Sequence, residues 1–185
     1  MAALSQAVGI PPLVAHLLAR RGCTTPEAAR VFLNVPSTAL HDPRAMAGMA
    51  VAVDRLQHAV SRREPILVCG DYDVDGVTGM AILVTGLTRA GAEVAYAVPN
   101  RLEHGYGLPA SVVEEAAARG VRVLVTVDHG ISAHAEVSLA RDRGLDVIIC
   151  DHHLPPPALP PATAILNPRQ PGCAYPFKEL SGVGI

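Results

Sequence analysis

The 185-residue sequence is poor in the side chains that most often hold nucleic acid. It contains no tryptophan, 3% aromatic residues in all, and a single lysine, Lys178. A platform of aromatic rings on which bases stack, as in RRM or OB folds, is therefore not expected. The net charge of −2 excludes a uniformly basic surface that binds nucleic acid by electrostatic attraction alone. Any contact with nucleic acid must come from a few placed residues.

Long apolar runs and paired cysteines are also missing. No apolar run reaches the roughly 20 residues that span a bilayer, and no basic segment precedes an apolar one near Met1. We therefore expect a soluble, cytoplasmic protein with no membrane partner. The cysteines Cys23, Cys69, Cys150 and Cys173 form no C-x-x-C pair. We expect them to be reduced packing residues rather than zinc ligands or disulfides.

The chain has enough apolar residues for one core, because half of its residues are hydrophobic and 17% are charged. Residues 1–64 are predicted to form a helical N-terminal segment. Thr25-Pro26 has the composition of a helix start, and apolar residues recur at helical spacing from Met49 to Val60.

From residue 65 onward, short apolar runs alternate with helical stretches. The runs, which we expect to be strands, are Ile66–Cys69, Val94–Val98, Val121–Val127, Val147–Cys150 and Ala164–Leu166. Helices are predicted at Val77–Ala90, Pro109–Arg119 and Ala133–Arg143, each followed by a glycine where a helix C-cap belongs. This alternation predicts an α/β fold over residues 65–185. The expected architecture is a doubly wound, mainly parallel five-stranded sheet with helices on both faces.

Acidic residues and histidines follow three of the predicted strands. The first is followed by Asp71 to Asp75, the third by Asp128-His129, and the fourth by Asp151-His152-His153. Five of the nine aspartates and three of the eight histidines thus fall at the carboxyl ends of strands. Ligands bind at that edge in open parallel sheets, so a functional site is predicted there.

The three aspartates after the first strand alternate along the chain. If the segment is extended, Asp71, Asp73 and Asp75 project their carboxylates into one space. There they repel one another unless a cation lies among them. With Asp128 and the His-His pair they offer oxygen and nitrogen donors that suit Mn²⁺, Mg²⁺ or Fe²⁺. Two such ions about 3.5–4 Å apart would activate water and neutralise a phosphoryl group, which predicts metal-dependent phosphoester hydrolysis.

Other interpretations of these residues compete with the metal site. Asp75 alone is explained equally well as a helix N-cap. A calcium loop of the EF-hand type is rejected because its twelfth position is Ile82 rather than glutamate. The run from Asp73 also resembles haloacid-dehalogenase phosphatases, in which Asp73 would be a covalent nucleophile, but their later lysine has no counterpart except Lys178. His129 either joins the site or bonds within its turn.

Five short motifs resemble the DHH phosphoesterase superfamily, and within it the branch of single-stranded-DNA exonucleases. They are GDYDVDG (70–76), NRLEHGYGL (100–108), VDHGIS (127–132), DHHLP (151–155), and ILNP (165–168) with LSGVG (180–184). They occur in the order of the family and cover the chain from about Ile66 to its end. One departure is His129, where that branch commonly carries asparagine or cysteine.

The resemblance implies a hydrolase that degrades single-stranded DNA from 5′ to 3′ with two Mn²⁺ or Mg²⁺ ions. It also implies a role in DNA recombination and repair, with single-stranded DNA and other repair proteins as partners. Members of the superfamily complete the metal set with a later aspartate and add a second domain, and the nuclease branch adds an OB-fold. We therefore expect this chain to be an N-terminal piece that is weak or inactive alone.

The resemblance implies that Asp73, Asp75, Asp128 and His152 are metal ligands and that Asp71 and His153 are catalytic. Residues 100–108 follow the second strand and so face the same edge, where Arg101, His104 and Tyr106 are predicted to bind substrate. Arg101 can fork onto a phosphate and Tyr106 can lie against a sugar or base, unless Gly105–Gly107 is only a turn. Ser181–Gly184 would either offer N–H groups to an anion or simply pack tightly.

Two further alternatives remain open. The first is another DHH phosphoesterase: an oligoribonuclease, a cyclic-dinucleotide phosphodiesterase or a pyrophosphatase. The second is a non-catalytic DHH-like module that binds replication partners. The second is disfavoured because an abandoned site has no reason to keep mutually repelling carboxylates.

Overall fold

The computed structural model describes residues 2–34 and 40–185, apart from the side chain of His104. The chain divides into two compact units, Met1–Leu40 and His41–Ile185. The sequence placed a boundary at residues 64 and 65. The larger unit instead begins at His41, because helix α4 (Met49–Arg62) packs against strand β5 (Ala164–Leu166).

The smaller unit consists of the helices α1 (Ala2–Val8), α2 (Pro12–Arg20) and α3 (Pro26–Leu33). Thr25 caps α3, since its hydroxyl oxygen accepts from the amide of Ala28, as the sequence predicted. Among the described residues no single helix is long and apolar enough to cross a membrane. The pair α1 and α2 reaches the length and composition only together, with a bend of 107° between them.

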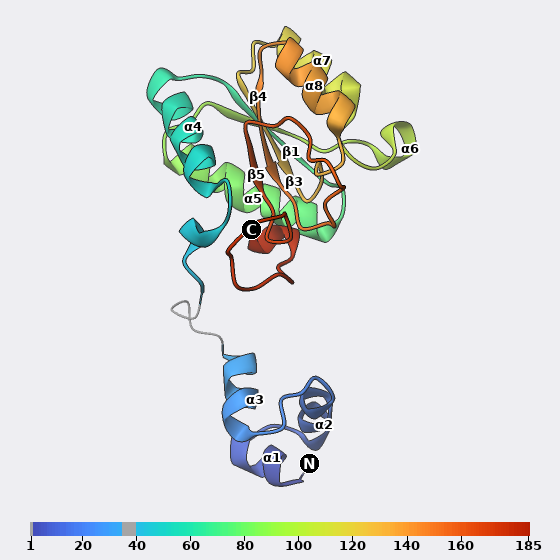
Figure 1. The fold of residues 1–185 in the computed structure, drawn as a ribbon. Coiled ribbons are helices and arrows are strands. Elements are labelled where there is room, and N and C mark those ends of the chain that lie inside the picture. The colour runs from blue at the N-terminus through green and yellow to red at the C-terminus, as the bar shows by residue number, and fades with distance from the viewer. Residues whose placement is uncertain (1, 35–39) are drawn as a thin grey trace. The chain divides into compact units, whose positions relative to one another are not determined.

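A five-stranded parallel sheet forms the centre of the larger unit (Figure 1). Its strands are β1 (Ile66–Gly70), β2 (Val94–Ala97), β3 (Val123–Val127), β4 (Asp146–Cys150) and β5, in the order β2-β1-β3-β4-β5. The five predicted strands and the doubly wound α/β class are confirmed. In this strand order the direction of winding reverses between β1 and β3, and such switch points are where ligands bind.

The helices of the larger unit follow the prediction with one addition. After α4 come α5 (Val74–Arg89), α6 (Arg101–His104), α7 (Ala110–Ala118) and α8 (His134–Asp142), and short 3₁₀ turns η2 (Pro43–Ala45) and η3 (Gly182–Gly184) complete the unit. Helix α6 was not predicted. It begins where the side chain of Asn100 accepts a hydrogen bond from the amide of Leu102.

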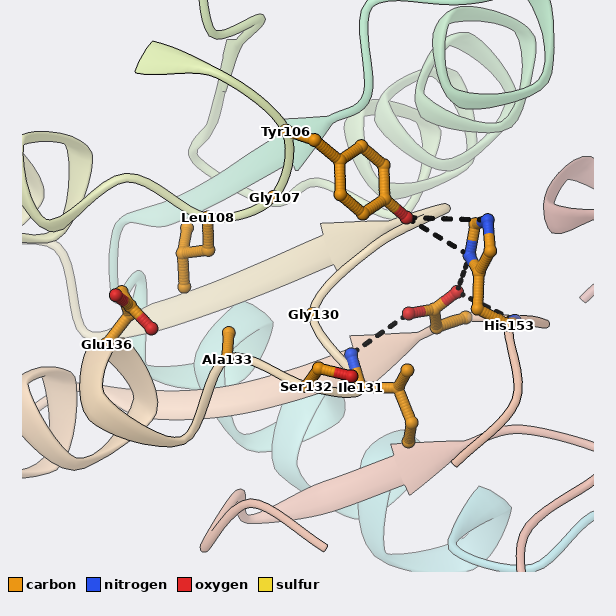
Figure 2. A pocket seen from close by; sticks show the side chains of 10 residues that line it. Tyr106, Gly107, Leu108, Gly130, Ile131, Ser132, Ala133, Glu136 and His153 are labelled. Carbon is orange, nitrogen blue, oxygen red and sulfur yellow. Dashed lines mark hydrogen bonds and ion pairs between the residues drawn. The ribbon is translucent and has the colours of Figure 1, made fainter. Parts of the chain in front are cut away.

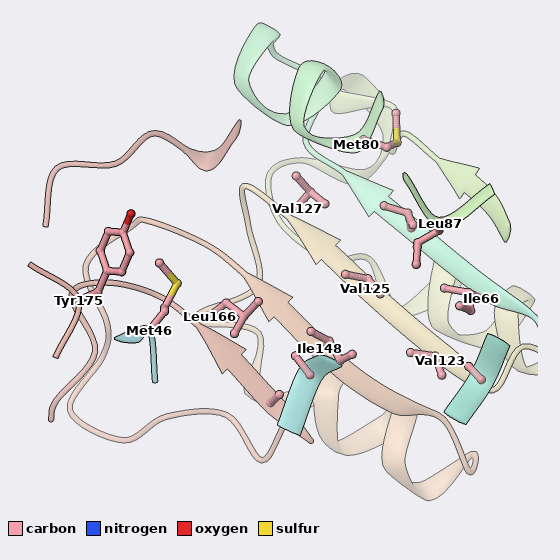
Figure 3. Close-up of a cluster of buried hydrophobic side chains, with 14 residues drawn as sticks. Met46, Ile66, Met80, Leu87, Val123, Val125, Val127, Ile148, Leu166 and Tyr175 are labelled. Atoms are coloured by element: carbon pink, nitrogen blue, oxygen red, sulfur yellow. The ribbon is translucent and has the colours of Figure 1, made fainter. Parts of the chain in front are cut away.

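The sheet is buried on both faces, which explains its unbroken apolar runs. On the α4 and α5 face, alternate residues such as Val68, Val125 and Ile148 join one core (Figure 3). The intervening residues, such as Leu124 and Ile149, join a second core beneath α7 and α8. The sheet is thus a rigid support, and its carboxyl edge is free to carry polar loops.

The cysteines match the expectation of reduced packing residues. All four are free, and Cys69 is fully buried in the second core. Burial raises the pKa of the Cys69 thiol to about 12, as it does for Cys150, so both stay protonated.

Candidate metal centre at the carboxyl edge of the sheet

The strand register brings three aspartates side by side. The ladder continues one residue beyond each strand: the amide of Asp71 donates to Val127 at 3.1 Å, and that of Asp128 donates to Cys150 at 2.9 Å. The amide of Asp151 likewise donates to Leu166 at 3.0 Å. When neighbouring parallel strands end in register, the residues that directly follow them lie side by side. The expectation that these side chains gather at one edge of the sheet is therefore confirmed.

Asp128 is the centre of the cluster. It contributes ligand atoms to two groups, one with His152 and His153 and one with Asp71 and Asp73, and within each group these atoms lie within 4.8 Å of one another. His152 Nε2 is 3.1 Å from Asp128 Oδ1 and 3.7 Å from Asp75 Oδ2. The structure therefore brings together all six residues predicted as metal ligands or catalytic groups.

The environment of Asp128 favours a bound cation. Asp128 is 2% exposed, and the described residues supply its Oδ1 with no hydrogen-bond donor other than His152 Nε2, 3.1 Å away. Burial, and then the facing carboxylates of Asp75 and Asp73, raises the pKa of Asp128 to about 7. Its φ of +66° is unusual for a residue with a side chain. Such strain persists only where the surroundings enforce it, which is common at functional sites.

Asp73 and Asp75 reach the site differently from the prediction. Asp73 Oδ1 accepts from the amides of Asp75 at 2.9 Å and Gly76 at 3.1 Å, so Asp73 is the N-cap of α5. Asp75 lies inside the first turn of the helix. The interpretation of Asp75 as the cap was wrong. The extended geometry assumed for the three alternating aspartates was also wrong, because the capping bonds start the helix at Val74.

The last turn of the chain holds Asp75 in place. The amide of Gly182 donates to Asp75 Oδ2 at 2.8 Å, and the amide of Val183 donates to Asp75 Oδ1 at 2.6 Å. The anion that these N–H groups bind is therefore a carboxylate of the chain itself. A Cβ on Gly182 would lie 2.6 Å from Asp128 Oδ1, so only glycine lets η3 approach both aspartates.

Asp151 orients His153. It is fully buried and accepts from the amide of Ile131 at 2.9 Å, the amide of His153 at 3.1 Å and His153 Nδ1 at 2.7 Å (Figure 2). Because a carboxylate only accepts, Nδ1 carries the proton and Nε2 is left free. No role for Asp151 was predicted from the sequence, although its position after a buried strand and before two histidines was a usable signal.

The predicted substrate contacts are only partly brought to the site. The hydroxyl of Tyr106 lies 3.2 and 3.4 Å from the ring nitrogens of His153, and its ring packs edge-on against that histidine. Arg101 lies over the ring of Tyr72 at 5.0 Å and makes no contact with the carboxylates in the described part of the chain. The side chain of His104 lies outside the described residues. Tyr106 therefore contacts a predicted site residue, and its contact with substrate stays a prediction.

His129 is a core residue beneath the site. It is fully buried, its Nε2 is 3.0 Å from the carbonyl oxygen of Cys69, and its Nδ1 has no partner among the described residues. Burial lowers the pKa of His129, which keeps the ring neutral. The alternative in which His129 bonds within its own turn was wrong, because its partner is the carbonyl of Cys69 in β1.

A doubly wound sheet with carboxylates and paired histidines at its switch point has the architecture of a metal-dependent phosphoesterase. Residues 65–185 match the model of the DHH family, N-terminal domain, and the chain belongs to that family. Membership of this family replaces the haloacid-dehalogenase interpretation.

Several of the relatives are named as RecJ exonucleases. The chain is 46% identical over 182 residues to the single-stranded-DNA-specific exonuclease RecJ of Bacillus subtilis (strain 168), a match that covers 98% of this chain and 23% of the relative. A crystal structure of exonuclease RecJ bound to manganese matches 79% of this chain and 37% of its own, with a TM-score of 0.71 and 37% identity. RecJ from Thermus thermophilus in complex with Mn²⁺ matches 95% of this chain and 26% of its own, with a TM-score of 0.67 and 31% identity. The chain thus spans about a quarter of the length of the Bacillus relative.

The residues present fit a divalent ion. Carboxylate oxygens and one imidazole nitrogen form a donor set that suits Mn²⁺ or Mg²⁺. A buried carboxylate that faces other carboxylates, and whose Oδ1 has only the Nε2 of His152 beside it among the described residues, is costly unless a cation lies there. The structure thus supplies a reason for a metal that does not depend on the relatives.

Proposed function

We propose that this chain is the metal-binding part of an exonuclease that hydrolyses single-stranded DNA from its 5′ end. The observation that carries the proposal is the clustering of four aspartates and His152, with Asp128 at the centre. The names of the relatives support DNA as the substrate, and their manganese-bound structures support the cofactor. Work in recombination and repair, partner repair proteins and a cytoplasmic location belong to the same proposal.

The proposed ligands are Asp73, Asp75, Asp128 and His152. Asp73 is fixed by the start of α5 and Asp75 by the amides of η3, so neither needs to reorganise when an ion binds. When bound, two Mn²⁺ or Mg²⁺ ions lower the pKa of water and neutralise charge on the phosphate.

The remaining polar residues handle the substrate. His153 presents Nε2 beside Tyr106, where it can donate to a phosphate oxygen or to the departing oxygen once protonated. Asp151 holds that ring in one orientation, and Asp71 lies among the proposed ligands. Arg101, on exposed α6, is free to reach a DNA phosphate. His104 is proposed as a further DNA contact.

Digestion of 5′-labelled single-stranded DNA with Mn²⁺ tests the proposal. The assay is run on this chain and on the longest natural polypeptide that contains it, each as wild type, Asp128→Ala and Asp142→Ala. Asp142 is an exposed aspartate on α8 and serves as the control. We expect the longer polypeptide to release the 5′ label as mononucleotides, with this activity abolished only in Asp128→Ala, and we expect weak or no digestion by this chain alone. Cleavage of oligoribonucleotides or cyclic dinucleotides but not of DNA would contradict the proposal that DNA is the substrate. Absence of hydrolysis in every protein would contradict the proposal that the protein is a nuclease.

A further inference from the structure

A cavity of about 260 Å³ lies beside His153, one of the residues of the candidate metal centre (Figure 2). It lies between three loops at the carboxyl edge, which follow α6, β3 and β4. Among the described residues that were predicted as site residues, only Tyr106 and His153 line it. His153 also belongs to the cluster around Asp128, so this histidine is shared between the metal centre and the cavity.

The lining is suited to an uncharged group. Leu108 and Ile131 offer apolar surface, and Tyr106, which is 58% exposed, offers an aromatic ring. Besides the free Nε2 of His153, the lining offers the hydroxyl of Ser132 and the carboxylate of Glu136, for neither of which the described residues supply a hydrogen-bond partner. Asp151 also lines the cavity. Its carboxylate already accepts hydrogen bonds from the amides of Ile131 and His153 and from the ring of His153.

The charge of the lining argues against a phosphate. Within the described part of the chain no lysine or arginine lines the cavity, and Glu136 would repel an anion. A carboxylate and a hydroxyl instead favour a neutral group that donates hydrogen bonds. The volume lies below the roughly 300–1,000 Å³ of pockets for drug-sized ligands. One sugar with its base fits that size better than a dinucleotide.

We propose that this cavity binds the sugar and base of the nucleotide whose phosphate lies at the metal centre. The inference rests on the proposed function, because it places the phosphate beside His153. The sugar is joined directly to that phosphate, so it must occupy space next to His153, and the cavity is that space. Tyr106 then offers a ring against which the base can stack.

Glu136 gives the cavity a preference among bases. Cytosine carries an amino group that donates to a carboxylate, whereas thymine carries a carbonyl oxygen at the same position of the ring. Glu136 therefore favours cytosine over thymine.

The test compares the binding of deoxycytidine monophosphate with that of inorganic phosphate, by calorimetry in the presence of Mg²⁺. Ala133 lines the cavity, so Ala133→Leu fills it, and exposed Ala135 on α8 gives the matched control Ala135→Leu. We expect wild type and Ala135→Leu to bind the nucleotide at least tenfold more tightly than phosphate. Ala133→Leu should bind deoxycytidine monophosphate and inorganic phosphate with affinities within twofold of each other. Its affinity for phosphate should equal that of wild type. Absence of the preference in wild type, or its survival in Ala133→Leu, would overturn the proposal.

The base preference is tested with Glu136→Gln. We expect wild type to bind deoxycytidine monophosphate severalfold more tightly than thymidine monophosphate. A glutamine amide can accept from cytosine or donate to thymine, so the variant should bind both within twofold. An unchanged ratio would overturn the role of Glu136. Because binding requires no turnover, a protein that binds the nucleotide as expected but degrades no DNA would refute the exonuclease and leave the cavity assignment standing.

Discussion

Gly182→Ala should disable the metal centre from a position that offers no ligand side chain. The added Cβ would lie 2.6 Å from Asp128 Oδ1 and 2.8 Å from Asp128 Cβ, closer than real Cβ atoms approach. To relieve this contact, either Asp128 or η3 must move. Movement of η3 withdraws the two amides that hold Asp75 at 2.6 and 2.8 Å. One methyl group thus disturbs two of the four proposed ligands.

The size of the effect follows from the contacts. Overpacking of this kind costs about 1–3 kcal/mol, and each hydrogen bond to a charged group contributes about 1.5–3 kcal/mol. Loss of groups that orient metal ligands typically weakens metal binding about 10–100-fold. We expect the Mn²⁺ dissociation constant to rise about 10–100-fold. The melting temperature of the metal-free protein should fall by roughly 2–12 °C.

Calorimetric titration with Mn²⁺, together with thermal unfolding in EDTA, measures both effects. Gly184→Ala in the same turn is the matched control, because its Cβ would meet the flexible end of Leu180 at 3.1 Å. This control should bind Mn²⁺ within about threefold of wild type. A folded Gly182→Ala protein whose Mn²⁺ affinity stays within twofold of wild type would refute the role of η3.

Three further substitutions test other parts of the site. Asp128→Asn should abolish Mn²⁺ binding but stabilise the metal-free protein at pH 8. The pKa of Asp128 is about 7, above the ordinary 3.8, so the wild-type protein loses stability as the pH rises from about 4 through 7. The melting temperature of the variant should not show this decrease with pH. Asp151→Asn should lower turnover about 10–100-fold with Mn²⁺ affinity retained, because an amide can donate to His153 Nδ1 and reverse its tautomer; unchanged turnover would contradict this. Arg101→Ala should raise KM for single-stranded DNA about tenfold, and an equal loss of Mn²⁺ affinity would show that Arg101 is structural.

The sheet could be predicted from sequence because parallel strands buried on both faces leave unbroken runs such as Val123–Val127. Helix α6 was missed because four residues are too few to show a helical period. The boundary at residue 64 differs from the compact unit beginning at His41, since the packing of α4 on β5 is a tertiary contact without a local signal.

The part of the candidate site that directly follows the strand ends could be predicted from the sequence. Asp71 and Asp128 meet because their strands are parallel neighbours in register, and this could be inferred from the chain order. The clamp on Asp75 could not be inferred, because backbone amides 107 and 108 residues away leave no mark in the pattern of side chains. The cap formed by Asp73 was hidden for a different reason: the alternating aspartates suit an extended segment and a helix start equally well.

X-ray diffraction at the manganese absorption edge, from crystals grown with Mn²⁺, tests the central claim most directly. The account predicts anomalous peaks within coordination distance of Asp73, Asp75, Asp128 and His152, with η3 still bonded to Asp75. Manganese bound elsewhere, or no peak at this edge of the sheet at saturating Mn²⁺, would contradict the account.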